Sequence, residues 1–320
     1  PELYTRVVRE ICDYVLREMT DSTGTFWSAQ DAEVDAKEGG NYVWLPDQVR
    51  EAVPDNALAE LALRLYGLDR GTNFQDPHHP QEPRTNVLFL PQRLDELARE
   101  REIPLGQLLE SKQRIDEQML AVRDQRKQPG TDDKVLISWN GIMIAAMSRA
   151  GRELDESRYR KAAVRAARYI LDHMRTEDGG LYRTMRRGTV KIEGFLEDYA
   201  FFVHALLELF RTEADSKWLE AAKQLVHVAT GKFGADQKLE GGYYDTLADQ
   251  ADLFVRTRTT YDGAIPTGNS QMVHNLIDLY DLTENVAYLD RAAADLKSFG
   301  GTLRQQGVGM VHMQHAVLRA

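Results

Sequence analysis

The sequence predicts an all-α fold, an (α/α) toroid of helical hairpins with short β-hairpins in the loops. One signal returns three times in the same register, an anchor residue followed twenty positions later by an aromatic residue: Trp139 and Tyr159, Asp198 and Trp218, Gly268 and Tyr288. Each aromatic opens an alanine-rich segment with helical apolar spacing. Apolar residues between the anchors also align, with Met143, Phe202 and Met272 in one row. The repeat is therefore a helical hairpin whose first helix starts at the anchor.

The length of the repeat favours a toroid. The anchors lie 59 and 70 residues apart, whereas tetratricopeptide and armadillo repeats span roughly 34 to 47 residues. The first helix of each hairpin should line the inside of a toroid, and Ile142–Met147 and Phe201–Phe210 are apolar nearly all round. The second helix should be amphipathic, as Arg158–Arg175 is. A superhelical solenoid is the alternative architecture.

Glycine-aromatic turns follow the alanine-rich helices. They are Gly24–Trp27, Gly179–Tyr182 and Gly241–Tyr244. Alternating segments at Leu181–Met185 and Tyr243–Leu247 are expected to form short hairpin strands, because glycine punctuates the chain and aromatics favour strands.

The remaining elements extend the pattern toward both ends. Tyr4–Met19 is predicted to be an outer-type helix, residues 71–85 a loop, and helices should resume at Pro91 and Pro104. Val311–Val317 resembles the opening of another inner helix. A closed six-hairpin barrel needs twelve helices and about ten are visible in the pattern. We therefore expect residues 1–320 to form one (α/α) barrel domain that is incomplete at both ends.

Composition excludes several classes of function. The 320 residues carry a net charge of −10 with interspersed signs, which argues against nucleic acid, whose phosphates require a basic surface. Cys12 is the single cysteine, so neither an internal disulfide nor a zinc cage can form. No apolar run approaches the ~18 residues of a membrane span. Phosphate-loop and nucleophile-elbow motifs are also missing. We expect a cytoplasmic protein without a membrane segment, cofactor or metal.

The candidate site lies where the inner helices begin, because parallel inner helices bring their N-termini to one mouth. Acidic, amide and aromatic residues gather at these starts: Asp133, Trp139, Asn140, Glu197, Asp198, Tyr199, Tyr261, Asp262 and Asn269. Such a set suits a carbohydrate-like small molecule, whose ring stacks on an aromatic while carboxylates and amides bind its hydroxyls. Asp133, Asp198 and Asp262 are the catalytic candidates, since two carboxyls about 5 to 9.5 Å apart can hydrolyse a glycosidic bond. The others are substrate-binding candidates.

Structural roles compete with each of these assignments. Asp and Glu before a helix are ordinary caps, stabilised by free backbone N–H groups and the helix dipole. Trp139 and Tyr199 can equally be core aromatics whose polar tips find one partner. Asp31, in an acidic stretch with Glu33 and Asp35, could hold substrate hydroxyls or a cation, or the stretch could be a solvated loop.

Several segments resemble one family in the same order along the chain. They are Asp132–Ile144, Phe26–Glu33 with Glu38–Trp44, Asn86–Leu88, Gly194–Phe201 and Tyr261–Ser270. Together they resemble the thioredoxin-domain proteins related to spermatogenesis-associated protein. The pattern departs at Gln30, where the family has Glu, and at Thr267, where it commonly has Ser.

The resemblance implies a thioredoxin-like domain followed by a barrel similar to six-hairpin glycosidases and N-acylglucosamine 2-epimerase. The thioredoxin-like domain is absent from these residues, so we expect no redox role here, although such a domain could act in cis or in trans. The expected function is that of a glycoside hydrolase or a sugar isomerase. The alternative is a non-catalytic module that binds a ligand or partner alongside that domain.

Histidines offer a second chemistry. His204 and His274 stand six residues after their anchors, and His312 and His315 open the last segment. Epimerases of similar fold use histidine to move protons beside a sugar carbonyl, and histidine titrates in the required range. A histidine on an apolar inner helix can instead be a satisfied core residue.

Overall fold

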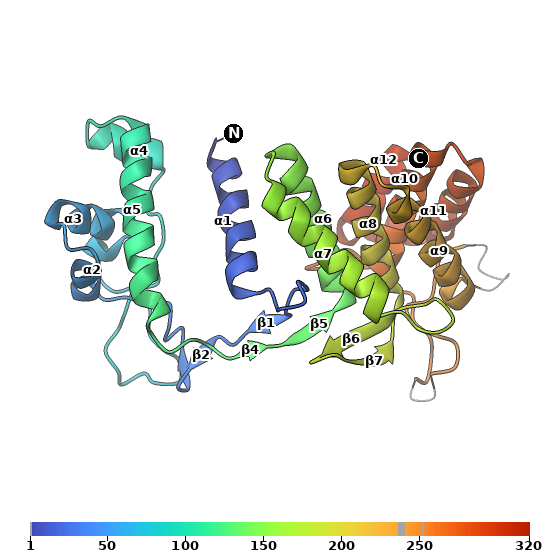
Figure 1. Ribbon diagram of the computed structural model, residues 1–320, viewed down its shortest axis with the longest axis horizontal. Helices are drawn as coiled ribbons and strands as arrows, with labels where there is room; N and C mark the ends of the chain where they lie inside the picture. Colours follow the sequence, from blue (N-terminus) through green and yellow to red (C-terminus); the bar gives the residue numbers. More distant parts are fainter. Residues whose placement is uncertain (1, 236–240, 251–252) are drawn as a thin grey trace. The chain divides into compact units, whose positions relative to one another are not determined.

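The computed structural model describes residues 2–235, 241–250 and 253–320 of the chain (Figure 1). The chain divides into two compact units, one made of residues 1–29 and 133–320, the other of residues 30–132. The second unit is thus inserted, along the sequence, between the first helix of the larger unit and the rest of it. Whether the chain forms the single barrel domain expected from its sequence stays a prediction.

The larger unit consists of helical hairpins. Its helices are α1 (Glu2–Glu18), α6 (Ile137–Glu153), α7 (Ser157–His173), α8 (Leu196–Glu213), α9 (Ser216–Phe233), α10 (Gly268–Thr283), α11 (Val286–Gln306) and α12 (Val311–Arg319), with a 3-10 turn, η2, at Gly307–Gly309. The inner helices α6, α8, α10 and α12 pack against one another in succession, while α7, α9 and α11 each pack against the preceding inner helix (Figure 1). The predicted all-α class of (α/α) hairpins is confirmed.

Residue composition explains which helices lie inside. Helix α8 is buried on nearly every side, and α10 is buried from Gly268 to Leu279. Helix α7 buries one stripe that includes Tyr159, Ala163 and Ile170. Helices α6 and α8 approach closely because Gly141 has no side chain: a Cβ atom there would lie 2.6 Å from the backbone of Phe201. The aligned apolar rows of the sequence therefore mark the shared core.

The β-structure of this unit is small. Strands β5 (Lys134–Leu136), β6 (Tyr182–Arg186) and β7 (Thr189–Glu193) form an antiparallel sheet in that order, with Val135 opposite Met185 and Thr184 opposite Lys191. The strand predicted at Leu181–Met185 is therefore confirmed within one residue. The strand predicted at Tyr243–Leu247 is wrong, because Tyr243 forms only an isolated bridge with Gly234.

The inserted unit has its own core. Its elements are β1 (Ala29–Gln30, which begins one residue earlier), β2 (Glu33–Val34), β3 (Lys37–Glu38), α2 (Pro46–Ala52), α3 (Asn56–Leu65), η1 (Leu68–Arg70), α4 (Leu94–Glu100), α5 (Leu105–Asp124) and β4 (Thr131–Asp132). Leu65, Leu108 and Ile115 are among its fully buried residues. The Arg126 guanidinium lies 3.9 Å from the ring centre of Trp44, which belongs to this core. Residues 71–85 hold no named helix or strand, as predicted.

Among the described residues, no helix combines the length and the apolar character that crossing a lipid bilayer requires.

Candidate functional site

Two asparagines at the starts of inner helices bind the backbone of a preceding turn. Asn140 Oδ1 accepts from Phe26 N at 2.8 Å, and Asn140 Nδ2 donates to Phe26 O at 2.9 Å. Asn269 repeats the arrangement with Tyr243, at 2.8 Å and 3.0 Å. Both side chains are buried. Each asparagine therefore fastens a helix start to a glycine-aromatic turn, and we call these paired hydrogen bonds the backbone clamps.

Tyr199 occupies the equivalent position in the middle hairpin. Its hydroxyl accepts from Leu181 N at 2.9 Å, and its ring packs edge-on against Phe233. A Cβ atom at Gly180 would lie 2.5 Å from that hydroxyl, so the turn requires glycine. In all three hairpins, the residue after the anchor thus binds the backbone of a glycine-aromatic turn and holds that turn against the helix start.

Asp198 lies fully buried at the start of α8. Its Oδ1 accepts from Ser138 N at 3.1 Å, and its Oδ2 accepts from Phe195 N at 2.9 Å and Arg183 Nη1 at 3.0 Å. Burial raises its pKa to about 6, although Arg183 and the two backbone N–H groups act in the opposite direction. The pKa suits an acid or base near neutral pH, but protein donors occupy both oxygens.

Asp133 and Asp262 are also bound by protein groups. The Asp133 carboxylate pairs with Arg186 and, at 2.9 Å, with Arg187, and these guanidiniums hold its pKa below the ordinary value. Asp262 accepts from Thr267 N at 2.9 Å and from His312 N at 2.9 Å. The latter bond caps the first turn of α12.

A cavity of about 360 Å³ lies beside the start of α8. It is lined by Phe195, Glu197, Asp245, Thr259, Tyr261, Thr267, Gly268 and the loop 263–266. Of the residues predicted from the sequence, it brings together Glu197 and Tyr261. The Tyr261 side chain is 69% exposed and forms part of the rim.

Arg183, on β6, links the buried carboxylate to the cavity wall. Its Nη2 lies 2.8 Å from Glu197 Oε1, and its Nη1 lies 3.0 Å from Asp198 Oδ2. The same guanidinium stacks 4.5 Å from the Phe195 ring centre. Asp198 therefore positions Glu197 and Phe195 through Arg183, while Glu197 itself, about one-third exposed, faces the cavity.

Asp245 is a cavity residue that sequence reasoning missed. Its Oδ2 accepts from Thr259 N, Thr259 Oγ1 and Thr257 Oγ1, each at 2.8 Å. Its backbone carbonyl accepts from Leu196 N at 3.0 Å and so holds this segment against the start of α8. In the sequence, only the spacing of Asp245, Thr257 and Thr259 could have indicated this site. The sequence instead predicts that Asp245 lies in a strand, Tyr243–Leu247.

The remaining candidates do not line this cavity. Trp139 is 47% exposed at the start of α6. Asp31 belongs to the inserted unit, where its Oδ1 accepts from Glu33 N at 3.1 Å in a local turn. Their roles as substrate-binding residues stay predictions.

The histidines form a separate group among α8, α10 and α12. The rings of His274 and His312 lie 4.1 Å apart, and His315 lies 5.3 Å from His274. Burial, then the neighbouring His274, lowers the pKa of His312 to about 4, and burial also lowers the pKa of His204. The lowered pKa values keep His204, His274 and His312 mostly neutral at pH 7. In the described part of the chain, no set of three His, Cys, Asp or Glu side chains is placed to hold a metal ion.

Comparisons with known proteins agree with the resemblance seen in the sequence motifs. No protein-family model matches. The human protein named spermatogenesis-associated protein 20 is 31% identical over 343 residues, which cover 99% of this chain and 43% of that protein. The chain is similar to spermatogenesis-associated protein 20. The mouse protein is 30% identical over 98% of this chain and 42% of its own length. The chain thus spans less than half the length of these relatives, and the thioredoxin-like domain stays a prediction.

Solved structures with partial similarity include three that act on carbohydrates by name. An alpha-mannanase of glycoside hydrolase family 76 from Bacteroides thetaiotaomicron has 18% identity and a TM-score of 0.44, covering 56% of this chain and 46% of its own. A cellobiose 2-epimerase from Bacillus thermoamylovorans has 20% identity and a TM-score of 0.44, covering 52% of this chain and 44% of its own. A D-mannose isomerase has 21% identity and a TM-score of 0.43, covering 52% and 42%.

Proposed function

We propose that the cavity beside α8 binds a neutral, hydroxyl-rich small molecule of the carbohydrate class. The observation that carries this proposal is the convergence of Glu197, Asp245 and the exposed ring of Tyr261 on one cavity. Its volume of about 360 Å³ lies within the range typical of small-molecule sites, roughly 300 to 1,000 Å³. The size suits a mono- or disaccharide unit.

The chemistry of the wall supports a sugar more than an apolar ligand. A carboxylate accepts hydrogen bonds from two adjacent hydroxyls, and a tyrosine ring offers a flat apolar face for the C–H side of a sugar ring. Asp245 already has one oxygen engaged by Thr257 and Thr259, which holds the carboxylate in one orientation. Two carboxylates facing one cavity also disfavour anionic ligands such as sugar acids.

The acid–base roles of Asp133, Asp198 and Asp262 remain a hypothesis within this proposal. Their oxygens accept bonds from protein groups, so Glu197 is the carboxylate best placed to meet a bound sugar. A hydrolase or isomerase would need Glu197 together with a second group at the cavity. Because protein donors already bind the oxygens of the three aspartates, the geometry favours the second candidate function, a module that binds sugar without converting it.

Ligand-observed saturation-transfer NMR tests the binding site with D-mannose and cellobiose as neutral probes and D-glucuronate as an anionic probe. Wild-type protein should bind a neutral probe and bind glucuronate less well. Glu197→Gln and Tyr261→Ala should each weaken binding by about tenfold or more. Glu220→Gln, an exposed carboxylate on α9 that is not among the cavity residues, is the matched control and should bind as the wild type does.

Two results would overturn the proposal. One is equal binding by wild type and Glu197→Gln; the other is the absence of binding for every neutral sugar tried. Turnover separates the two candidate functions, because an enzyme should convert a bound probe to product, and Asp198→Asn should abolish that conversion if Asp198 acts as acid or base. Binding without conversion supports the non-catalytic module.

A further inference from the structure

Helix α7 carries an unusual charge balance for a protein with a net charge of −10. Its seventeen residues include five cations and one carboxylate: Arg158, Arg160, Lys161, Arg165 and Arg168 against Asp172. Arg158 is paired with Asp13, at 2.9 Å. The other four cations lie at helical positions i, i+1, i+5 and i+8, so they share one side of the helix.

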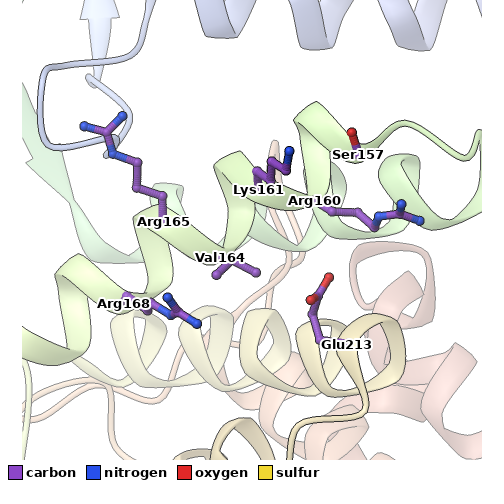
Figure 2. A pocket seen from close by; sticks show the side chains of 7 residues that line it. All are labelled: Ser157, Arg160, Lys161, Val164, Arg165, Arg168 and Glu213. Carbon is purple, nitrogen blue, oxygen red and sulfur yellow. The ribbon is translucent and has the colours of Figure 1, made fainter.

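A hollow of about 450 Å³ lies along that side. It is lined by Ser157, Arg160, Lys161, Val164, Arg165, Arg168 and Glu213 (Figure 2). Figure 2 shows Glu213, the last residue of α8, directed toward α7 opposite Val164. Four cations, one carboxylate and an apolar side chain thus line the hollow.

Protein groups leave most of this positive charge uncompensated. Arg165 Nε donates to the Thr23 carbonyl at 3.0 Å and Nη2 donates to the Ser22 carbonyl, which fixes the side chain without neutralising it. Arg160 lies 3.4 Å from Asp155, whose carboxylate is 93% exposed and therefore screened by water.

The other two cations have even weaker compensation. Within the described part of the chain, Lys161 and Arg168 have no carboxylate within ion-pair distance, although Arg168 contributes to the lowered pKa of Asp215. Lys161 and Arg165 stand four residues apart, and like charges at that spacing destabilise a helix. A bound anion would relieve this repulsion.

We propose that the hollow binds a small molecule carrying a diphosphate or more than one phosphate group. Arginine guanidinium groups bind phosphate oxygens through two parallel hydrogen bonds, and three of the four cations are arginines. The cations extend over eight residues, or about 12 Å of helix, which is more than a single phosphate can contact. The Ser157 hydroxyl adds a neutral donor at one end, and Val164 can pack against the organic part of the ligand.

This site is independent of the cavity that we assign to a neutral sugar. Glu197 lines that cavity at the first turn of α8, whereas Glu213 lines the hollow at its last residue. Sixteen residues of helix separate the two, or about 24 Å. The cavity has carboxylates in its wall and the hollow has cations, so a phosphorylated ligand prefers the hollow.

Isothermal titration calorimetry with pyrophosphate and with orthophosphate tests the proposal. Wild-type protein should bind pyrophosphate about tenfold or more tightly than orthophosphate, and the affinity should fall with added salt. The double variant Lys161→Glu/Arg168→Glu should lose at least about tenfold in pyrophosphate affinity. Lys191→Glu/Lys223→Glu makes the same change of charge at an exposed site on β7 and a half-buried surface site on α9, and it should retain the affinity within about twofold. Glu197→Gln should leave it unchanged.

Three results would overturn the proposal. They are no binding of pyrophosphate to the wild type, equal loss in the two double variants, and preferential binding of an RNA oligonucleotide or a poly-glutamate peptide over pyrophosphate. Lys161 and Arg168 are exposed, so the variant should fold, as a thermal melt matching that of the control would verify. The single variant Arg168→Gln provides the same comparison if the double variant unfolds.

Discussion

The buried starts of the inner helices and the cavity beside them use the same kinds of residue for different purposes. Asp198 and Glu197 are neighbours in the sequence, yet Asp198 is enclosed by Ser138, Phe195 and Arg183 while Glu197 faces the cavity. Asn269 and Tyr261 differ in the same way, one buried in a backbone clamp and the other largely exposed. Burial and saturated hydrogen bonds, more than residue type, separate architecture from ligand binding here.

The largest expected effect tests the architectural side of this comparison. Asn269→Ala removes both hydrogen bonds to Tyr243 and leaves a buried N–H and a buried carbonyl without partners. Each unsatisfied group costs about 1 to 3 kcal/mol, so the free energy of unfolding should fall by roughly 2 to 6 kcal/mol. Urea denaturation measures this change, and Asn140→Ala should behave alike.

Asn285→Ala is the matched control for that measurement. Asn285 is an exposed cap at the start of α11, where it accepts from Ala287 N at 3.1 Å. Loss of such a cap should cost about 1 kcal/mol. If Asn269→Ala cost no more than this, the backbone clamps would not hold the hairpins together.

The intermediate effect concerns the pH dependence of Asp198. Its pKa is raised from 3.8 to about 6 in the folded state, so between these values the folded protein binds more protons than the unfolded chain. Stability from this group is therefore greatest below pH 4 and falls as the pH rises to 6, by roughly 3 kcal/mol. Urea denaturation from pH 4 to 7 measures the slope.

Asp198→Asn isolates that contribution from the other carboxylates. The variant cannot ionise, so the difference in unfolding free energy between wild type and variant should change across pH 4 to 6 and be flat above about pH 7. A pH-independent difference would mean that Asp198 titrates normally and that its burial has no electrostatic cost.

The smallest expected effect tests the ligand-binding side. Glu197→Gln retains the shape of the side chain, and its ion pair with Arg183 is partly exposed to water. The change should alter the free energy of unfolding by less than about 1 kcal/mol, while weakening sugar binding. A large loss of stability would mean that Glu197, like Asp198, is needed to hold the fold together. The contrast between a structural Asp198 and a ligand-binding Glu197 would then be wrong.

The fold was largely predictable because buried helix faces require apolar residues at regular spacing in the sequence. The aligned rows containing Phe202 and Met272 mark the inner helices, and the glycine before Leu181 marks a turn. The division of the chain into two compact units has no comparable periodic signal.

The site was only partly predictable. Glu197 and Tyr261 were found because they adjoin helix starts, but a polar residue at a helix start has the same sequence signature whether it binds backbone or ligand. Asn140 and Asn269 illustrate this ambiguity. Asp245 and Arg183 were missed because their importance depends on contacts with Thr259 and Glu197, which only the folded chain brings together.

The backbone clamps also set the boundaries of the repeating unit. Each clamp joins the turn after one outer helix to the start of the next inner helix, and the clamp between Phe26 and Asn140 spans 114 positions in the sequence. The unit held together by hydrogen bonds is therefore an outer helix, its turn and the following inner helix, and we call it a module. The hairpin repeat of the sequence instead pairs an inner helix with the outer helix that follows it, so the two units are offset by one helix. A duplication, deletion or graft of whole hairpins would therefore cut through a module at each end. An exchange whose ends fall in the turns α6–α7, α8–α9 or α10–α11 would keep each module intact.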